Sequence, residues 1–124
     1  MATDHHRRAS QKRRTLAAQG EDAAARWYRR RGAQILQRNV RYPVGEIDLI
    51  VREPSGDTVF VEVKTRSSEA FGAAESVTAW KLVKMRRAMS RWLSENPAGS
   101  VRIDVVSIVD GTLRVYQGVD DAAC

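Results

Sequence analysis

The sequence predicts a mixed α/β domain in which a helix precedes three strands, and a second helix precedes two more strands. Three observations predict it: an alanine-rich segment with helical spacing, two β-branched runs around a cluster of turn formers, and an amphipathic segment before an almost wholly apolar run. At 124 residues, the chain is long enough for one core but too short for two. We therefore expect one domain over residues 15–119, with a disordered basic tail (1–14) and a flexible C-terminus (120–124).

The first two elements lie between the tail and a Pro/Gly turn. Leu16 to Arg31 is rich in alanine and places apolar residues near helical spacing, and Gly32 follows as a stop signal. Ala33 to Val40 carries several apolar residues and ends before Tyr42-Pro43-Val44-Gly45. This pattern predicts a helix followed by the first strand.

The next two strands form a predicted antiparallel hairpin. Gly45 to Val51 and Val59 to Lys64 flank the turn formers Glu53 to Asp57. A turn centred on Ser55 gives one face in which Ile50 opposes Phe60. On the other face the pairs are apolar: Ile47 with Val63, Leu49 with Val61, and Val51 with Val59. A slip of one residue would mix polar and apolar sets, so the pattern favours this register.

The polar side of this hairpin carries opposed charges. Asp48 faces Glu62 in the predicted register, and Glu46 faces Lys64. Two charges at about 4 Å repel by ~4 kcal/mol at an effective dielectric near 20, and one lysine offsets only part of that. Carboxylate oxygens suit Mg²⁺ or Mn²⁺, so we predict a metal site here. The alternative is a cross-strand Glu46–Lys64 ion pair beside two solvated acids.

The second helix is predicted to begin at a Ser76 or Thr78 cap and to end near Glu95. Its positions divide into two stripes at steps of three and four. The apolar stripe contains Leu82, Met85, Met89, Trp92 and Leu93, and the cationic stripe contains Lys81, Lys84, Arg87 and Arg91. Such a helix packs one side on the core and exposes the other.

The last two strands follow this helix. Val101 to Val109 is mostly β-branched, which predicts a strand buried on both faces and parallel to the one before the helix. Asp104 within it should be hydrogen-bonded, and a bond to Arg102 alone would be insufficient. Asp110-Gly111 predicts a hairpin turn into an edge strand over Thr112 to Tyr116, which could support a homodimer.

Charge and composition restrict the classes of function. The chain carries a formal charge of +6, of which +4 lies in the first fourteen residues, so anionic partners are expected. No apolar run reaches the length of a membrane span, and the N-terminus lacks a secretory signal, so we expect a cytoplasmic protein without a membrane partner. The single cysteine, Cys124, excludes an internal disulfide. Trp27 and Trp92 fall on apolar stripes, whereas Trp80 is the tryptophan free to stack on a base.

Four segments together resemble the YraN-like family of uncharacterised bacterial proteins, within the PD-(D/E)xK nuclease superfamily. These segments are Gly20-Glu21, Gly45 to Ile50, Phe60 to Arg66, and Arg102 to Val106. The superfamily's first motif has proline where this chain has Ile47. The resemblance implies a restriction-endonuclease-like αβββαββ core, and the acidic set is similar to that of archaeal Holliday junction resolvases, which bind branched DNA.

The resemblance also implies roles for individual residues. Glu21, Asp48, Glu62 and Lys64 would be catalytic; Asp48, Glu62 and the Val63 carbonyl would bind Mg²⁺ or Mn²⁺. Independently of the resemblance, the cationic stripe and the ends of the hairpin offer six candidates for binding nucleic acid, DNA rather than RNA: Lys81, Lys84, Arg66, Arg41, Arg87 and Arg91. The hypothesis is a metal-dependent endonuclease. The alternatives are a noncatalytic nucleic-acid-binding module that keeps the fold, and a scaffold whose basic surfaces contact protein.

Overall fold

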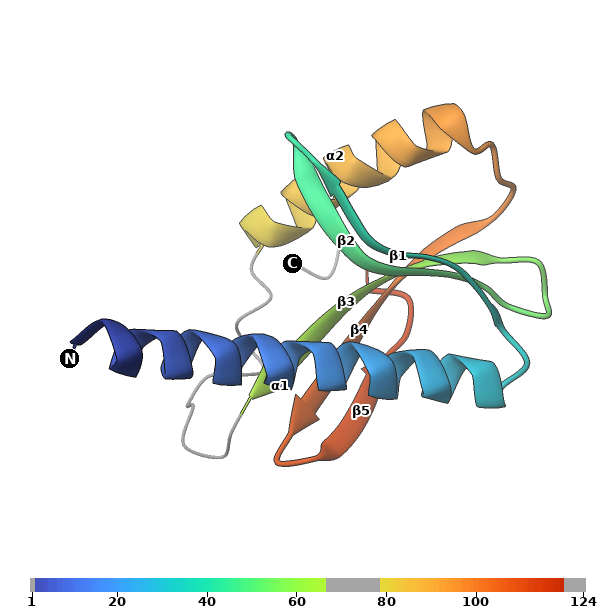
Figure 1. Ribbon diagram of the computed structural model, residues 1–124. Coiled ribbons are helices and arrows are strands. Elements are labelled where there is room, and N and C mark those ends of the chain that lie inside the picture. The colour runs from blue at the N-terminus through green and yellow to red at the C-terminus, as the bar shows by residue number, and fades with distance from the viewer. Residues whose placement is uncertain (1, 67–78, 120–124) are drawn as a thin grey trace.

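A single five-stranded sheet lies between two helices (Figure 1). The computed structural model describes the backbone of residues 2–66 and 79–119, and the side chains of residues 15–66 and 79–119. The elements are α1 (Ala2–Arg30), β1 (Gln34–Tyr42), β2 (Gly45–Arg52), β3 (Thr58–Arg66), α2 (Ala79–Glu95), β4 (Val101–Val109) and β5 (Thr112–Tyr116). The predicted mixed α/β fold is confirmed.

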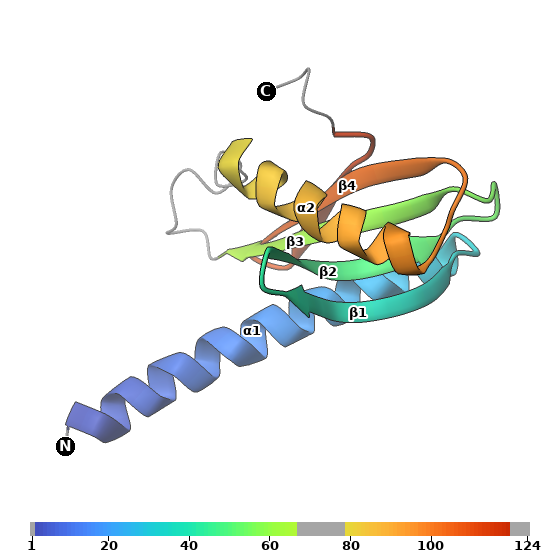
Figure 2. The same ribbon diagram turned by 90° about the horizontal axis from the view of Figure 1, so that it is seen from above.

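The strands lie in the sheet in the order of the chain, β1-β2-β3-β4-β5. Three neighbouring pairs are antiparallel, and β3 and β4 are parallel, as expected for strands joined through a helix. Figure 2 shows α2 on one face of the sheet and α1 on the opposite face. The predicted parallel connection through α2 is therefore confirmed, while the predicted caps Ser76 and Thr78 lie outside the described residues.

Helix α1 begins at Ala2, where composition predicts a disordered tail. This segment contains four arginines, which have high helix propensity, and it continues a helix already docked on the sheet. The first half of α1 extends past the sheet in both views (Figures 1 and 2). Only the second half therefore packs on the strands. No helix in the described part of the chain is both long enough and apolar enough to cross a lipid bilayer.

The sheet separates two apolar cores, one under each helix. The core under α1 contains Ala24, Ala25, Tyr28, Leu49, Val51, Val59, Val61, Val106 and Ile108. The core under α2 contains Val40, Ile47, Ile50, Phe60, Leu82, Met85, Ala88, Met89, Trp92 and Ile103. The predicted apolar stripe of α2 is confirmed, with Leu93 partly buried beside it.

The β2–β3 hairpin has the predicted register. Leu49 pairs with Val61, Ile50 with Phe60, and Val51 with Val59. One detail of the prediction is wrong: Ile47 packs in the α2 core, not on the α1 side with Leu49 and Val51. The alternation changes beside Asn39 of β1, which has a left-handed φ of 53°.

The β4–β5 turn also has the predicted form. Asp110 and Gly111 have φ angles of 49° and 78°, as a two-residue type I′ hairpin requires. Strand β5 is an edge strand with the bounds expected from the sequence. The fold thus leaves β1 and β5 as its two edges.

Candidate functional site

The acidic site is built where β2 and β3 stop pairing. Their ladder runs from Arg52–Thr58 to Leu49–Val61. Next along β2, a carboxylate oxygen of Asp48 accepts a hydrogen bond of 2.8 Å from the Val63 N–H. The Asp48 side chain thus takes the place of a β2 carbonyl as the partner of the Val63 N–H. This bond holds the Asp48 carboxylate between the two strands where they separate.

Two lysines hold the second carboxylate. Oε1 of Glu62 lies 3.3 Å from Nζ of Lys64 and 3.3 Å from Nζ of Lys81. The side chains of Glu62 and Lys64 are 14% and 12% exposed, whereas Lys81 reaches in from the surface of α2. Lys64 therefore pairs with Glu62 on its own strand, and not with Glu46 as in the alternative interpretation of this face. Glu46 instead lies 3.8 Å from Arg41, with both side chains exposed.

Asp48 is the electrostatically perturbed group of this site. Burial raises the pKa of Asp48, and the charges of Glu62, Glu21 and Glu46 raise it further, while the Val63 N–H lowers it; the result is about 7. An ordinary aspartate is fully ionised at neutral pH. Asp48 is therefore only partly ionised at neutral pH, and a nearby cation would favour its ionised form.

A glycine brings the first helix to this site. Gly20 of α1 is buried, and a Cβ there would overlap the hydroxyl of Thr65 on β3. Glycine permits this approach, because a larger residue would force the Thr65 side chain to shift or the helix to move away. The next residue, Glu21, is therefore close enough to raise the pKa of Asp48.

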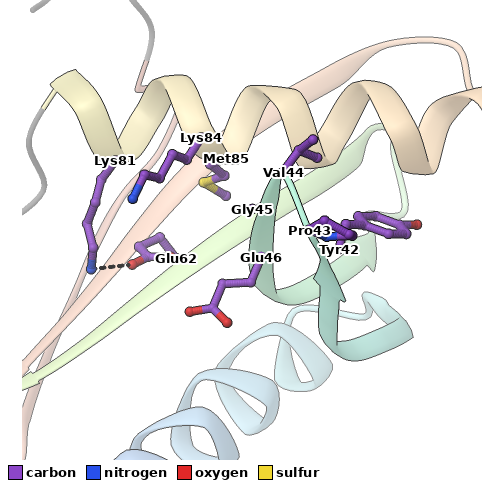
Figure 3. A pocket seen from close by; sticks show the side chains of 9 residues that line it. All are labelled: Tyr42, Pro43, Val44, Gly45, Glu46, Glu62, Lys81, Lys84 and Met85. Atoms are coloured by element: carbon purple, nitrogen blue, oxygen red, sulfur yellow. Dashed lines mark hydrogen bonds and ion pairs between the residues drawn. The ribbon is translucent and has the colours of Figure 1, made fainter.

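All the predicted catalytic residues line one cavity of about 360 Å³. Its walls include Glu21, Asp48, Glu62, Val63, Lys64, Arg66 and Lys81. A second cavity of about 320 Å³ adjoins it, since Glu46, Glu62 and Lys81 line both. Figure 3 shows this second cavity, with Lys81 extending from α2 to Glu62.

The six predicted nucleic-acid-binding cations occupy different places. Arg66 and Lys81 line the acidic cavity, and Lys84 lines the adjoining one. Arg87 and Arg91 are exposed on α2 and lie over the rings of Trp80 and Tyr42, respectively. Arg41 is exposed at the end of β1, beside Glu46. The set therefore extends from the acidic cavity along α2 and to the end of β1.

The donor set fits a hard divalent cation. Asp48 and Glu62 offer carboxylate oxygens, and Val63 lines the same cavity. In the described ranges, no group of three or more His, Cys, Asp or Glu side chains is arranged to hold a metal. Two carboxylates and a carbonyl match the way Mg²⁺ is usually held, with water and phosphate oxygens completing the coordination. Metal binding here would replace the lysine contacts of Glu62.

A second buried carboxylate forms a network outside the cavity. Asp104 is fully buried and accepts hydrogen bonds from the Tyr28 hydroxyl (2.6 Å), from Arg102 Nε and Nη2 (2.8 and 3.0 Å), and from the Gly118 N–H (3.1 Å). Arg102 also binds the buried Glu53 at 3.0 Å. Burial and the hydrogen bond to Asp104 raise the pKa of Tyr28. The expectation that Asp104 has hydrogen-bond partners besides Arg102 is confirmed. No pattern in the sequence identifies Tyr28 as one of them.

The chain is similar to known bacterial proteins along most of its length. Residues 20–108 match the model of the uncharacterised protein family UPF0102. The chain belongs to the UPF0102 family. A UPF0102 protein of Corynebacterium efficiens is 54% identical over 114 residues, covering 87% of this chain and 93% of that protein. The UPF0102 protein of Corynebacterium diphtheriae is 49% identical over 114 residues, covering 88% and 93%.

A relative from another genus matches a shorter stretch. The UPF0102 protein of Beutenbergia cavernae is 50% identical over 98 residues, covering 76% of this chain and 81% of that protein. The YraN-like resemblance is thereby confirmed as membership of UPF0102. The match spans every residue that lines the acidic cavity from Glu21 to Lys81.

Proposed function

We propose that this UPF0102 protein is a metal-dependent nuclease that hydrolyses DNA phosphodiesters. One observation carries the proposal: Asp48, with a pKa of about 7, and Glu62 share a cavity of about 360 Å³ with Lys64. A carboxylate left partly protonated by its neighbours is typical of functional sites. The surrounding cations supply attraction for a phosphate backbone.

Each residue has a role that follows from its position. Asp48 and Glu62 would hold Mg²⁺ or Mn²⁺, a Lewis acid toward a phosphate oxygen. Lys64 lies 3.3 Å from Glu62 in a largely buried position, where its ammonium would orient the attacking water and offset charge on the phosphoryl group. Glu21 faces the same cavity from α1 and would support the cation from the opposite side.

The order of elements supports the same proposal. The helix, three strands, helix and two strands follow the order that the PD-(D/E)xK resemblance implies, and the acidic residues lie on adjacent strands. We infer a restriction-endonuclease-like fold with structured or branched DNA as the substrate. The cytoplasm, where such DNA is found in bacteria, is the corresponding location.

Cleavage of a defined DNA panel tests the proposal. Purified protein with Mg²⁺ or Mn²⁺ should cut at least one of four labelled substrates: a four-way junction, a flap, a single strand or a duplex. Asp48→Asn and Lys64→Gln should each lower the rate by at least about 100-fold, because both act on the reacting phosphate. Asp22→Asn is the matched control, since Asp22 adjoins Glu21 but pairs with Arg38 at 2.7 Å. Cleavage that survives both substitutions would exclude this site.

A noncatalytic nucleic-acid-binding module is the second candidate. Glu62 is already neutralised by two ammonium groups, so the described site has charge balance there without a metal. Calorimetry separates the two functions. A nuclease should bind Mn²⁺, with uptake lost in Asp48→Asn, whereas a binding module should retain DNA and take up no cation.

A further inference from the structure

Trp80 is an exposed aromatic residue with no role in either core. It lies in the first turn of α2, and its side chain is 57% exposed, whereas Trp92 on the same helix is 4% exposed. An indole ring in water is unfavourable, since burying such a ring is among the largest apolar contributions of any side chain. Its exposure leaves an aromatic face open to solvent near the candidate active site.

Two cations flank the Trp80 ring. Nζ of Lys84 lies 5.4 Å from the ring centroid, and Cζ of Arg87 lies 5.7 Å from it. Both distances are within the range of cation–π attraction. The positions are i+4 and i+7 on the helix, so the cations and the ring share one exposed side of α2. An aromatic face beside cations matches the two parts of a nucleotide, a base and a phosphate.

The same surface continues into the acidic site. Lys84 contacts the Trp80 ring and also lines the cavity of about 320 Å³ shown in Figure 3. Lys81, the residue after Trp80, lies 3.3 Å from Glu62 and lines both cavities. Tyr42 lines the far side of this cavity, with Arg91 5.2 Å from its ring. Aromatic–cation pairs thus stand on two sides of the approach to Glu62.

We propose that Trp80, with Lys84 and Arg87, is a stacking platform for an unpaired base of a single-stranded DNA segment that leads to the acidic cavity. The proposal rests on the proposed nuclease function and names its substrate class: DNA with an unpaired segment. A paired base inside a duplex cannot offer its face to an indole ring, because neighbouring bases cover both of its faces. An unpaired base stacks on an aromatic side chain, and its phosphates meet the lysine and arginine.

Binding of two labelled oligonucleotides without metal tests this platform. Fluorescence anisotropy in EDTA compares a 15-nucleotide oligo-dT with a duplex of the same length. Trp80→Leu keeps an apolar side chain but loses the aromatic face, so it should weaken oligo-dT binding by about tenfold and duplex binding by less than about twofold. Trp80→Phe should retain most of the affinity. Equal losses for both oligonucleotides, or no loss for oligo-dT, would overturn the platform.

Two further variants separate stacking from charge. Lys84→Gln combined with Arg87→Gln should weaken binding of both oligonucleotides to a similar extent, because both contain phosphates. Oligo-dT should also quench the tryptophan emission of the wild-type chain, and Trp80→Phe should remove that quenching. This spectroscopic readout does not require the leucine variant to fold. Unchanged quenching in Trp80→Phe would place the stacked base elsewhere.

The two proposals fail in different ways. If the wild-type chain never cuts DNA but Trp80 still controls oligo-dT binding, the nuclease proposal fails and the platform stands. If Asp48→Asn abolishes cleavage while Trp80→Leu binds and cuts single strands normally, the platform fails and the nuclease stands.

Discussion

The protein contains two groups of acids, one buried and one partly buried, that differ in how completely hydrogen bonds and opposite charges satisfy them. Asp104 receives four hydrogen bonds, from a hydroxyl, a guanidinium and a backbone N–H. Asp48 receives one from the Val63 N–H and faces the charge of Glu62. The first carboxylate sits in a network saturated with donors, while the second lines an open cavity.

This difference distinguishes a carboxylate that stabilises the fold from one that is available to bind a ligand. A buried charge is tolerated when hydrogen bonds and an opposite charge replace its water. Asp104 meets that condition through Arg102 and Tyr28, so its contribution is to the fold. Asp48 meets it only in part, and its raised pKa reports the deficit. The free energy of the unfavourable Asp48–Glu62 contact would be recovered when a cation binds.

Asp104→Ala should give the largest loss of stability. It leaves the guanidinium of Arg102 and the hydroxyl of Tyr28 without their main partner inside the protein. Breaking a buried pair on one side costs about 3–5 kcal/mol in the free energy of unfolding, measured by urea denaturation. Asp57→Asn is the control, because Asp57 lies 3.8 Å from the same arginine and is 34% exposed. A loss below about 1 kcal/mol for Asp104→Ala would contradict a structural role.

Asp48→Asn should stabilise the metal-free protein above neutral pH. The unfolded chain releases the Asp48 proton near pH 3.8 and the folded chain near pH 7, so wild-type stability falls as pH rises between these values. Asparagine can still accept the Val63 N–H but carries no charge. The variant should therefore be more stable by up to about 4 kcal/mol at pH 8, with little difference at pH 4.

Denaturation at the two pH values, with and without Mn²⁺, checks this prediction. Mn²⁺ should stabilise the wild-type chain and leave Asp48→Asn unchanged, because only the wild type offers the second carboxylate. A variant less stable than the wild type at pH 8 would show that the Asp48 charge supports the fold.

Gly20→Ala should disturb the site by moving α1. This helix carries Tyr28, which binds Asp104, and Glu21, which raises the pKa of Asp48. An alanine Cβ would overlap the Thr65 hydroxyl, and relieving such overpacking costs about 1–2 kcal/mol. Glu21 would move away from Asp48, so the pKa of Asp48 should fall and cleavage should weaken. Thr65→Ala removes the clashing hydroxyl, and the double variant should regain much of the lost stability. An additive loss in the double variant would exclude this contact as the cause.

The sequence predicts the parts of this site that depend on alternation along a strand. The turn formers around Ser55 and the period of two fix the register, and the register puts Asp48 and Glu62 on neighbouring strands. The separation of the strands at Asp48 could not be predicted, because it depends on which group satisfies one N–H of Val63. The same holds for Ile47, whose change of side accompanies an irregularity in another strand.

Contacts between segments far apart in the chain also could not be predicted from the sequence. Tyr28 and Asp104 are 76 residues apart, and neither position carries a local pattern that names the other. From the sequence, Gly20 is a residue of low helix propensity within a helix. Its role in the close approach to Thr65 is evident only from the structure. Tertiary packing decides both, whereas the apolar stripe of α2 depends only on helical spacing and was predictable.

Lys81→Gln should have the smallest effect on stability and a selective effect on DNA binding. Lys81 is 46% exposed, and exposed ion pairs contribute less than about 1 kcal/mol, so the free energy of unfolding should change by about 0.5 kcal/mol or less. If Lys81 meets a phosphate at the cavity, the slope of log affinity against log salt should fall by about 1. Arg114→Gln removes the same charge from the exposed side of β5 and should leave that slope unchanged. An equal change of the slope in the two variants would mean that DNA binding depends on the net charge of the chain. It would contradict binding of a DNA phosphate by Lys81 at the acidic cavity.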